Sequence, residues 1–160
     1  MNKNEFYRNA RNDIPGPLSG VRVLEATTTW AGPMCAAVLA DLGADVIKVE
    51  IPSGDVGRAI QPNLPGTDVG FMHATVNRNK RGLSLDTRTD AGRDIFLKLA
   101  ESSDILVENF KVGTMAKYGL GYDQLSEMKP DIVYVSITGW GQFGPNHEAA
   151  GYDPLAQASS

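Results

Sequence analysis

Cationic side chains are concentrated in the middle of the chain, where they could hold a phosphate. Residues 77–82 (NRNKRG) include three cations within four residues, and Arg88 follows them. Arginine and lysine bind phosphate oxygens through charge-assisted hydrogen bonds, and arginine can do so with two parallel bonds. A run of charges is usually only a solvated surface, but the side chains of Asn77 and Asn79 can order a turn. We therefore expect a structured loop here, with Arg88 as a further cation behind it.

Residues 27–33 (TTTWAGP) could form a second anion-binding element. Small residues before a helix allow backbone N–H groups to approach a ligand, and the helix dipole favours an anion there. The alternative is a plain turn between a strand and a helix, with Trp30 packed against the core. Because the segment lacks the glycine fingerprint of a dinucleotide site, both interpretations stay open.

Asn109 and Phe110 follow an apolar stretch, and Lys117 comes a few residues later. An aromatic ring beside an amide suits a flat base such as adenine, but a core phenylalanine and a turn asparagine would look the same. Glu50 ends another apolar stretch. We expect a strand-end charge or an anchor for the loop behind it rather than a ribose ligand, because no glycine fingerprint precedes it.

Short apolar segments that alternate with helical patterns would position these residues. The expected strands are residues 21–26, 45–50, 82–86, 105–107 and 131–137, and the expected helices are residues 34–42, 89–101, 112–117 and 122–128. This alternation predicts a doubly wound, mostly parallel α/β sheet. Ligands of such sheets bind beyond the carboxyl ends of the strands. Two glycine-rich loops, 51–70 and 138–145, follow strands and are candidates for function.

The composition is that of an ordinary globular domain. The 160 residues carry a net charge of −4, which provides no basic excess for a nucleic-acid surface. Cys35 is the single cysteine and cannot form an internal disulfide, so we expect a reducing compartment. No apolar stretch is long enough to span a membrane. We therefore expect a cytoplasmic protein with no nucleic-acid or membrane partner.

The two ends of the chain differ in character from its middle. Residues 1–16 are expected to form an N-terminal arm before an α/β domain of residues 17–160. Near the other end, Asp153 and Pro154 have the residue types of a helix N-cap and of the first helical position. Because a domain rarely stops one or two turns into a new helix, we expect the complete protein to continue beyond Ser160.

Several short motifs occur in an order that is typical of one family. They are PLSGVRVLE, AGP, LADLGADVIKVE, NRNKR, VENF and SITGWGQFGP. From Pro17 to Ser160 the sequence resembles the class III CoA-transferases, which include the formyl-CoA, carnitine and bile-acid CoA-transferases. The α-methylacyl-CoA racemases are related and share the fold. The resemblance implies that the chain holds an incomplete, Rossmann-like, CoA-binding large domain, and that the remainder and a second domain are absent.

The resemblance also implies a set of residues that contact coenzyme A, with no metal: Trp30, Ala31, Leu85, Arg88, Asn109, Phe110 and Lys117. The backbone of the first two would contact CoA, and the others would hold its adenine and phosphate ends. Two positions depart from family members. Ile51 stands where some carry an arginine for CoA, and Ala150 stands where formyl-CoA transferase carries a lysine. Binding of the phosphates would then depend more on Arg88, on Lys117 or on residues further along the complete protein.

The activity implied by the resemblance is transfer of CoA from an acyl-CoA donor to a small carboxylic acid. In the family an aspartate is the nucleophile and forms an aspartyl-CoA thioester, a form of covalent catalysis. That aspartate would lie in a Gly-Asp segment beyond Ser160, so no catalytic residue is assigned, and Asp153 is not its counterpart. The 160-residue chain should be inactive alone, and the complete protein should be an interlocked homodimer.

Two alternative functions are considered. The related racemases carry a catalytic histidine in the segment that matches residues 150–153, where this chain has Tyr152. A phenol is a poor general base at neutral pH, so this residue favours a transferase. A non-catalytic CoA-binding module is the second alternative, and an assay of CoA transfer would distinguish it.

Overall fold

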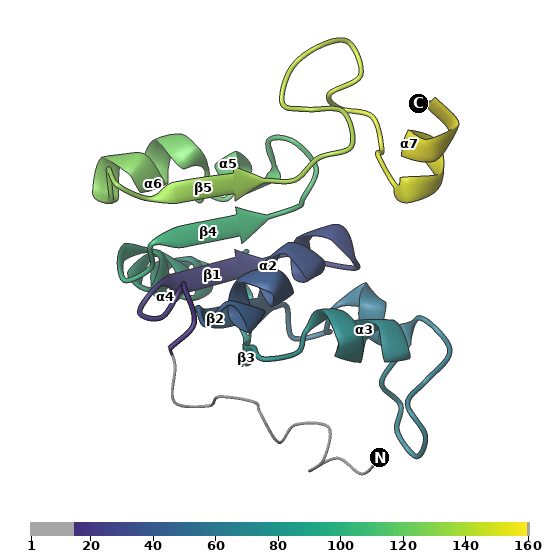
Figure 1. The fold of residues 1–160 in the computed structure, drawn as a ribbon. Coiled ribbons are helices and arrows are strands. Elements are labelled where there is room, and N and C mark those ends of the chain that lie inside the picture. Colours follow the sequence, from purple (N-terminus) through teal and green to yellow (C-terminus); the bar gives the residue numbers. More distant parts are fainter. Residues whose placement is uncertain (1–14, 160) are drawn as a thin grey trace.

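The computed structural model describes residues 15–159, so most of the expected arm 1–16 lies outside the described residues. The strands of its sheet are β1 (Arg22–Ala26), β2 (Asp45–Glu50), β3 (Arg81–Ser84), β4 (Ile105–Glu108) and β5 (Val133–Ser136). All neighbouring strands run parallel, in the order β3-β2-β1-β4-β5 (Figure 1). This arrangement confirms the predicted doubly wound parallel sheet.

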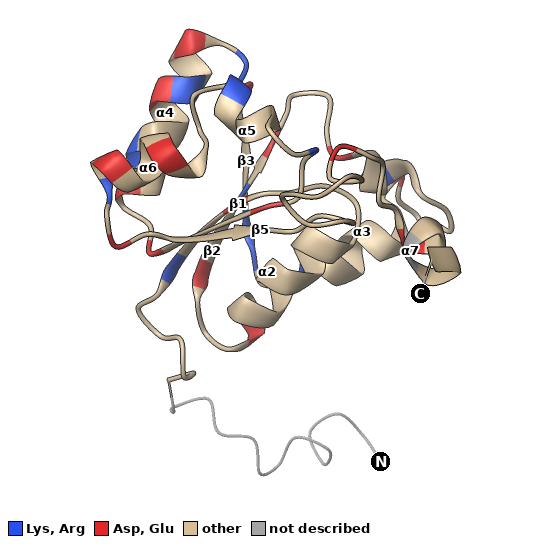
Figure 2. Ribbon diagram, turned by 90° about the horizontal axis from the view of Figure 1, so that it is seen from above, with Lys and Arg blue, Asp and Glu red and all other residues tan. Residues whose placement is uncertain are grey.

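Helices cover both faces of the sheet. The covering helices are α2 (Ala31–Asp41), α3 (Phe71–Val76), α4 (Asp90–Glu101), α5 (Thr114–Lys117) and α6 (Tyr122–Met128). The structure also has the short 3₁₀ helix η1 (Val56–Ala59) and α7 (Asp153–Ser159), and α7 lies apart from the sheet (Figure 1). Figure 2 shows α4, α5 and α6 on one side of the sheet and α2 and α3 on the other. No helix within residues 15–159 is both long and apolar enough to cross a membrane.

The side chains of the central strand β1 alternate between two cores, as successive residues of a strand must. Leu24 packs with Phe96 of α4 in one core, whereas Val23 packs with Ala36 of α2 in the other. A parallel strand covered on both faces is normally apolar throughout. Glu25 breaks this rule, because it lies on the α2 side with Val23 and is fully buried.

The direction in which the chain winds changes between β1 and β4. From β1 the chain runs outward to β2 and β3, and it then returns to place β4 on the other side of β1. In doubly wound sheets such a reversal opens a crevice at the carboxyl ends of the two strands, where ligands bind. The segments that follow β1 and β4, including residues 27–30 and Asn109, lie at this crevice.

The structure differs from the sequence predictions at a few places. η1 lies within the loop 51–70, and α3 begins directly after this loop. Both helices are too short to show a helical period in the sequence. β3 begins one residue earlier and ends two residues earlier than expected. Asp153 lies in the first turn of α7 instead of capping it.

Replacing Phe96 with alanine should destabilise the protein by about 3–5 kcal/mol, because its fully buried ring fills the core between α4 and the sheet. The matched control is the neighbouring Ile95→Ala, a side chain that is 45% exposed and should cost less than about 1 kcal/mol. Urea unfolding followed by circular dichroism measures both losses. Equal losses would contradict this orientation of α4.

Candidate functional site

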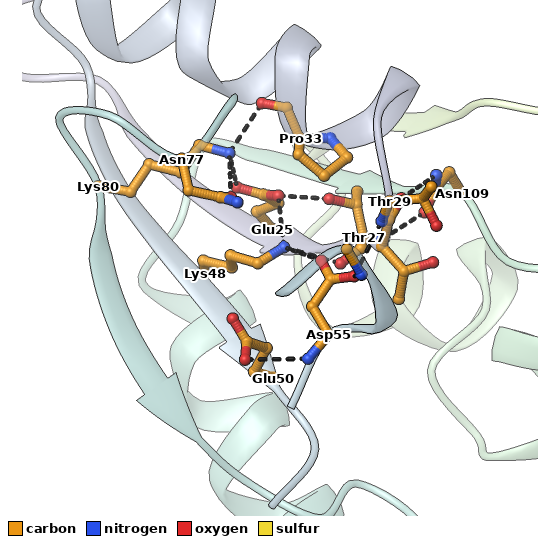
Figure 3. Close-up of polar contacts among 12 residues, drawn as sticks. Glu25, Thr27, Thr29, Pro33, Lys48, Glu50, Asp55, Asn77, Lys80 and Asn109 are labelled. Atoms are coloured by element: carbon orange, nitrogen blue, oxygen red, sulfur yellow. Dashed lines mark hydrogen bonds and ion pairs between the residues drawn. The ribbon is translucent and has the colours of Figure 1, made fainter. Parts of the chain in front are cut away.

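Four charged side chains form a continuous series at the carboxyl ends of β1 and β2, on the α2 side of the sheet (Figure 3). Lys80 Nζ lies 2.7 Å from Glu25 Oε2. Lys48 Nζ lies 3.2 Å from Glu25 Oε1 and 3.2 Å from Asp55 Oδ2. None of these side chains is more than 4% exposed. We call Lys80, Glu25, Lys48 and Asp55 the buried charge chain; its two cations and two anions balance.

Strand register brings the central pair together. Glu25 of β1 lies directly opposite Lys48 of β2, and both residues have the parity of the α2 face. Buried charges are costly unless they are paired and their remaining hydrogen-bonding groups are satisfied. Lys80 meets this requirement by also donating to the carbonyl of Pro33 at 2.8 Å and to Asn77 Oδ1 at 3.1 Å. The buried charge chain therefore ties α2 and the loop before β3 to the centre of the sheet.

Each cation of the loop before β3 already has a carboxylate partner. Arg78 pairs with Asp41, and Arg81 pairs with Asp45. Lys80 belongs to the buried charge chain. The expectation of an ordered loop is confirmed, and its three cations are engaged with carboxylates of the protein.

Asp55 connects the buried charge chain to the turn between β1 and α2. Its Oδ1 accepts hydrogen bonds from the N–H of Thr29 at 3.0 Å and from the N–H of Gly57 at 2.8 Å. Burial alone would raise the pKa of Asp55, but these two N–H groups and Lys48 together outweigh burial and lower the pKa below its ordinary value. Asp55 is therefore held as a carboxylate. Lys48 adds a bond of 2.9 Å to the carbonyl of Thr27 in the same turn.

The backbone of this turn has an unusual conformation. Thr29 has a φ of 70°, in the left-handed region that β-branched residues rarely adopt. The preceding residue is fixed on both sides by Asn109, whose Oδ1 accepts from the Thr28 N–H at 2.8 Å and whose Nδ2 donates to the Thr28 carbonyl at 2.9 Å. The following residue, Trp30, is 49% exposed, so the interpretation that packed it against the core is wrong.

α2 begins close against the turn because its second residue is glycine. A Cβ at Gly32 would lie 2.5 Å from Thr27 Cβ and 3.0 Å from Asn109 Cγ. Ala31 and Gly32 are in the first turn of α2, where N–H groups have no partner within the helix. The turn thus presents backbone donors at the carboxyl ends of β1 and β4, where an anion site was one of the two interpretations of the sequence.

Glu50 anchors the loop behind β2, which was one of the two roles expected for it. It accepts two hydrogen bonds from Arg58, at 2.7 and 3.0 Å, and one from the N–H of Asp55 at 3.1 Å. His73 of α3 lies on its other side, with Nε2 4.0 Å from Glu50 Oε1. Residues 55–58 of the long loop are therefore held at two points. Glu50 binds the Arg58 side chain and the Asp55 N–H, and the buried charge chain holds the Asp55 side chain.

Arg88 and Lys117 come together on the other side of the sheet. They line an open pocket of about 480 Å³, which we call the cationic pocket. Arg93 of α4 is a third cation in it, which the sequence analysis missed; its place one turn into the helix after Arg88 is the only sequence signal. Arg88 makes two bonds to Asp86, at 2.7 and 2.8 Å, and lowers the pKa of that carboxyl to about 2.

The remaining predicted residues have supporting places. Leu85 and Phe110 are half-buried and pack against the core on the α4 side. The structure therefore agrees with a core phenylalanine, and with Asn109 as a turn residue whose amide is engaged with the backbone. The seven predicted residues fall into a cationic pair, a group around the β1–α2 turn and two core side chains.

A second pocket, of about 330 Å³, is lined by Glu108 at the end of β4. Glu108 was not among the residues selected from the sequence, and burial raises the pKa of its carboxyl. Ser136 donates to its Oε1, the Phe110 N–H donates to its Oε2 at 2.9 Å, and Gln142 donates to Ser136. The glycine-rich loop is thus joined to the sheet.

Within residues 15–159, no cluster of three or more His, Cys, Asp or Glu side chains could hold a metal ion.

Comparison with known proteins identifies the family. A family model described as CoA-transferase family III matches residues 18–160. The chain belongs to this family. The fold of this CoA-transferase family III chain agrees closely with a solved structure, a CaiB/BaiF family protein from Brucella suis. The two are 42% identical, with a TM-score of 0.86, over 91% of this chain and 39% of the other.

Curated relatives of this CoA-transferase family III chain are named for transfer of CoA between acids. A succinyl-CoA:mesaconate CoA-transferase from Haloarcula hispanica is 46% identical over 150 residues, and the human succinyl-CoA:glutarate CoA-transferase is 43% identical over 145 residues. The matches cover 89% and 90% of this chain but 38% and 33% of those proteins. The chain thus spans less than two-fifths of the length of these relatives.

The buried charge chain should make stability depend on pH. Because the pKa of Asp55 is lowered by folding, its stabilisation is present above the unfolded pKa of about 3.9 and is lost as the pH falls toward the lower folded value. Asp55→Asn should therefore cost about 3 kcal/mol at pH 6 and clearly less at pH 3. Urea unfolding at the two pH values measures this, with the exposed Asp68→Asn as the matched control. The same loss at both pH values would contradict an ionised Asp55.

Proposed function

We propose that the complete protein transfers coenzyme A from an acyl-CoA donor to a carboxylic acid, and that residues 17–160 contribute a CoA-binding domain. The observation that carries this proposal is the cationic pocket in a chain of this family. It places Arg88, Arg93 and Lys117 around one open volume at the carboxyl side of the sheet. Guanidinium and ammonium groups suit the phosphates of CoA, which carry several negative charges.

Five other predicted residues would hold the rest of the coenzyme. The backbone of Trp30 and Ala31 stands at the crevice between β1 and β4, and Asn109 fixes the turn before it. Phe110 and Leu85 pack against the α4-side core, and in this proposal they would contact the adenine end of the coenzyme. In this proposal CoA is a substrate, and no metal takes part.

The chemical step that we propose is nucleophilic catalysis by an aspartate that follows Ser160 in the complete protein. A carboxylate oxygen attacks the thioester carbonyl of the donor, and the C–S bond breaks to leave a mixed anhydride and CoA thiolate. The thiolate attacks the aspartyl carbonyl carbon and releases the donor acid, which yields an aspartyl-CoA thioester. The acceptor carboxylate then runs the same steps in reverse, so atoms and charges balance without any further reactant.

A dicarboxylic acid is the acceptor class that we propose. Relatives are named for pairs of succinyl-CoA with mesaconate or with glutarate, all of which are dicarboxylic acids or their thioesters.

Transfer is favoured over α-carbon racemisation by Tyr152, which is 70% exposed and offers a phenol in place of a basic imidazole. We also propose a cytoplasmic homodimer. Exposed apolar side chains such as Phe143 and Leu155 support a further contact surface on this chain.

Removing a cation from the pocket should weaken binding of coenzyme A. In the complete protein, Arg88→Ala and Lys117→Ala should each raise the Kd of CoA about tenfold, or about 1.4 kcal/mol, because each loses a charge-assisted bond to phosphate. The matched control is Arg81→Ala, an exposed arginine at the opposite end of β3 that also pairs with an aspartate. Calorimetric affinities that stay unchanged in both pocket variants would exclude the cationic pocket as the phosphate site.

The 160-residue chain and the complete protein should differ in activity. With succinyl-CoA and a dicarboxylic acid, we expect transfer by the complete protein only, because the proposed nucleophile is outside the chain. Mass spectrometry of the acyl-CoA products would measure both. Transfer by the 160-residue chain would show that the nucleophile lies within it, and no transfer by the complete protein with a panel of acids would favour the non-catalytic alternative.

A further inference from the structure

The turn between β1 and α2 stores backbone strain next to the proposed coenzyme site. Thr29 has a φ of 70°, and a threonine in this region is strained whereas a glycine is not. Strained residues persist only where their surroundings hold them, and they concentrate at functional sites. The strain lies directly before Trp30 and Ala31, whose backbone would contact the coenzyme.

The group that holds Thr29 is Asp55. The Thr29 N–H donates to Asp55 Oδ1 at 3.0 Å, across 26 residues of sequence. The carboxylate is aimed at this N–H by its other contacts, because Oδ1 also accepts from Gly57 and Oδ2 pairs with Lys48. Lys48 is in turn fixed by Glu25, and it also holds the Thr27 carbonyl of the same turn. The turn is thus held from the interior of the protein.

We infer that Asp55 is a positioning residue for coenzyme A: through Thr29 it keeps the β1–α2 turn in the strained conformation that presents the Trp30 and Ala31 backbone to the ligand. This inference rests on the proposed function. It assigns a ligand-positioning role to the loop behind β2, although this loop does not line the cationic pocket. It also explains why a carboxylate is buried at the N-cap of η1, where the helix is only four residues long.

A substitution pair separates positioning from simple structural support. In Asp55→Ala the strain at Thr29 has no opposing bond, so the turn should relax and the Kd of free coenzyme A should rise at least tenfold. In Thr29→Gly the left-handed φ costs nothing, so affinity should stay within about twofold of the wild type. The double variant should recover most of the lost affinity, because glycine needs no carboxylate to hold it.

Structural support alone predicts the opposite for the double variant. Glycine relieves the strain at Thr29 but gives Lys48 no carboxylate in place of Asp55, so it cannot repair a protein that is weakened by a broken buried ion pair. If Asp55→Ala does not fold, Asp55→Asn with and without Thr29→Gly makes the same comparison, with a smaller loss because the amide oxygen still accepts one bond. Arg58→Ala is the matched control, because it removes the two bonds between the same loop and Glu50 but leaves the bond between Asp55 and Thr29 in place.

The measurements are calorimetric titration of the complete protein with free coenzyme A and hydrogen exchange of the Thr28 amide. We expect exchange at Thr28 to accelerate at least tenfold in Asp55→Ala, to return toward the wild-type rate in the double variant, and to stay unchanged in Arg58→Ala. A double variant that binds no better than Asp55→Ala, or an Arg58→Ala variant that loses as much affinity, would overturn the inference. If the wild-type protein does not bind coenzyme A, the proposed function fails, whereas hydrogen exchange still tests the positioning of the turn.

Discussion

Glu25 and Lys48 face each other across β1 and β2 between the sheet and α2, and neither charge could remain there without the other. The pair leaves one carboxylate oxygen and further ammonium protons to be satisfied. Lys80 and Asp55 meet these needs, and each comes from a segment outside the two strands. Burial lowers the pKa of Lys80, while Glu25 opposes that shift by favouring the charged form. The pair therefore fixes neighbouring segments against the sheet, because its second carboxylate oxygen and its remaining ammonium protons need partners.

Three connections around the sheet gain order from these contacts. Loops usually run over the surface and are more mobile than the elements that they connect. Here the loop behind β2 reaches inward through Asp55, and the segment before β3 does so through Lys80. The turn behind β1 is held by Lys48 at Thr27 and by Asp55 at Thr29. One interior network thus sets the position of three separate connections, which suits a site that must meet a long ligand.

The sheet could be predicted from the sequence because its strands are apolar runs separated by helical patterns, and the strand ends followed from the topology. The buried charge chain could not. Glu25 and Lys48 look like ordinary strand charges until the register of β1 and β2 is known. Lys80 looked like a phosphate ligand because its neighbours are cations, and only tertiary contacts show that Asp41 and Asp45 neutralise Arg78 and Arg81. Of the three cations in the cationic pocket, Arg88 and Lys117 were selected from the sequence. Arg93 was not, because only the packing of α4 brings it to the pocket.

The two halves of the candidate site lie on opposite faces of the sheet, and this geometry constrains how one ligand could use both. The β1–α2 turn is on the α2 side, and the cationic pocket is beside α4 and α5 (Figure 2). A ligand that contacts both must cross the carboxyl edge, and the crevice between β1 and β4 is where the chain reverses its winding. Asn109 stands at the end of β4 and bonds both backbone groups of Thr28 behind β1, so it joins the two walls of this crevice. Its side chain therefore sets the spacing between the β1–α2 turn and the end of β4.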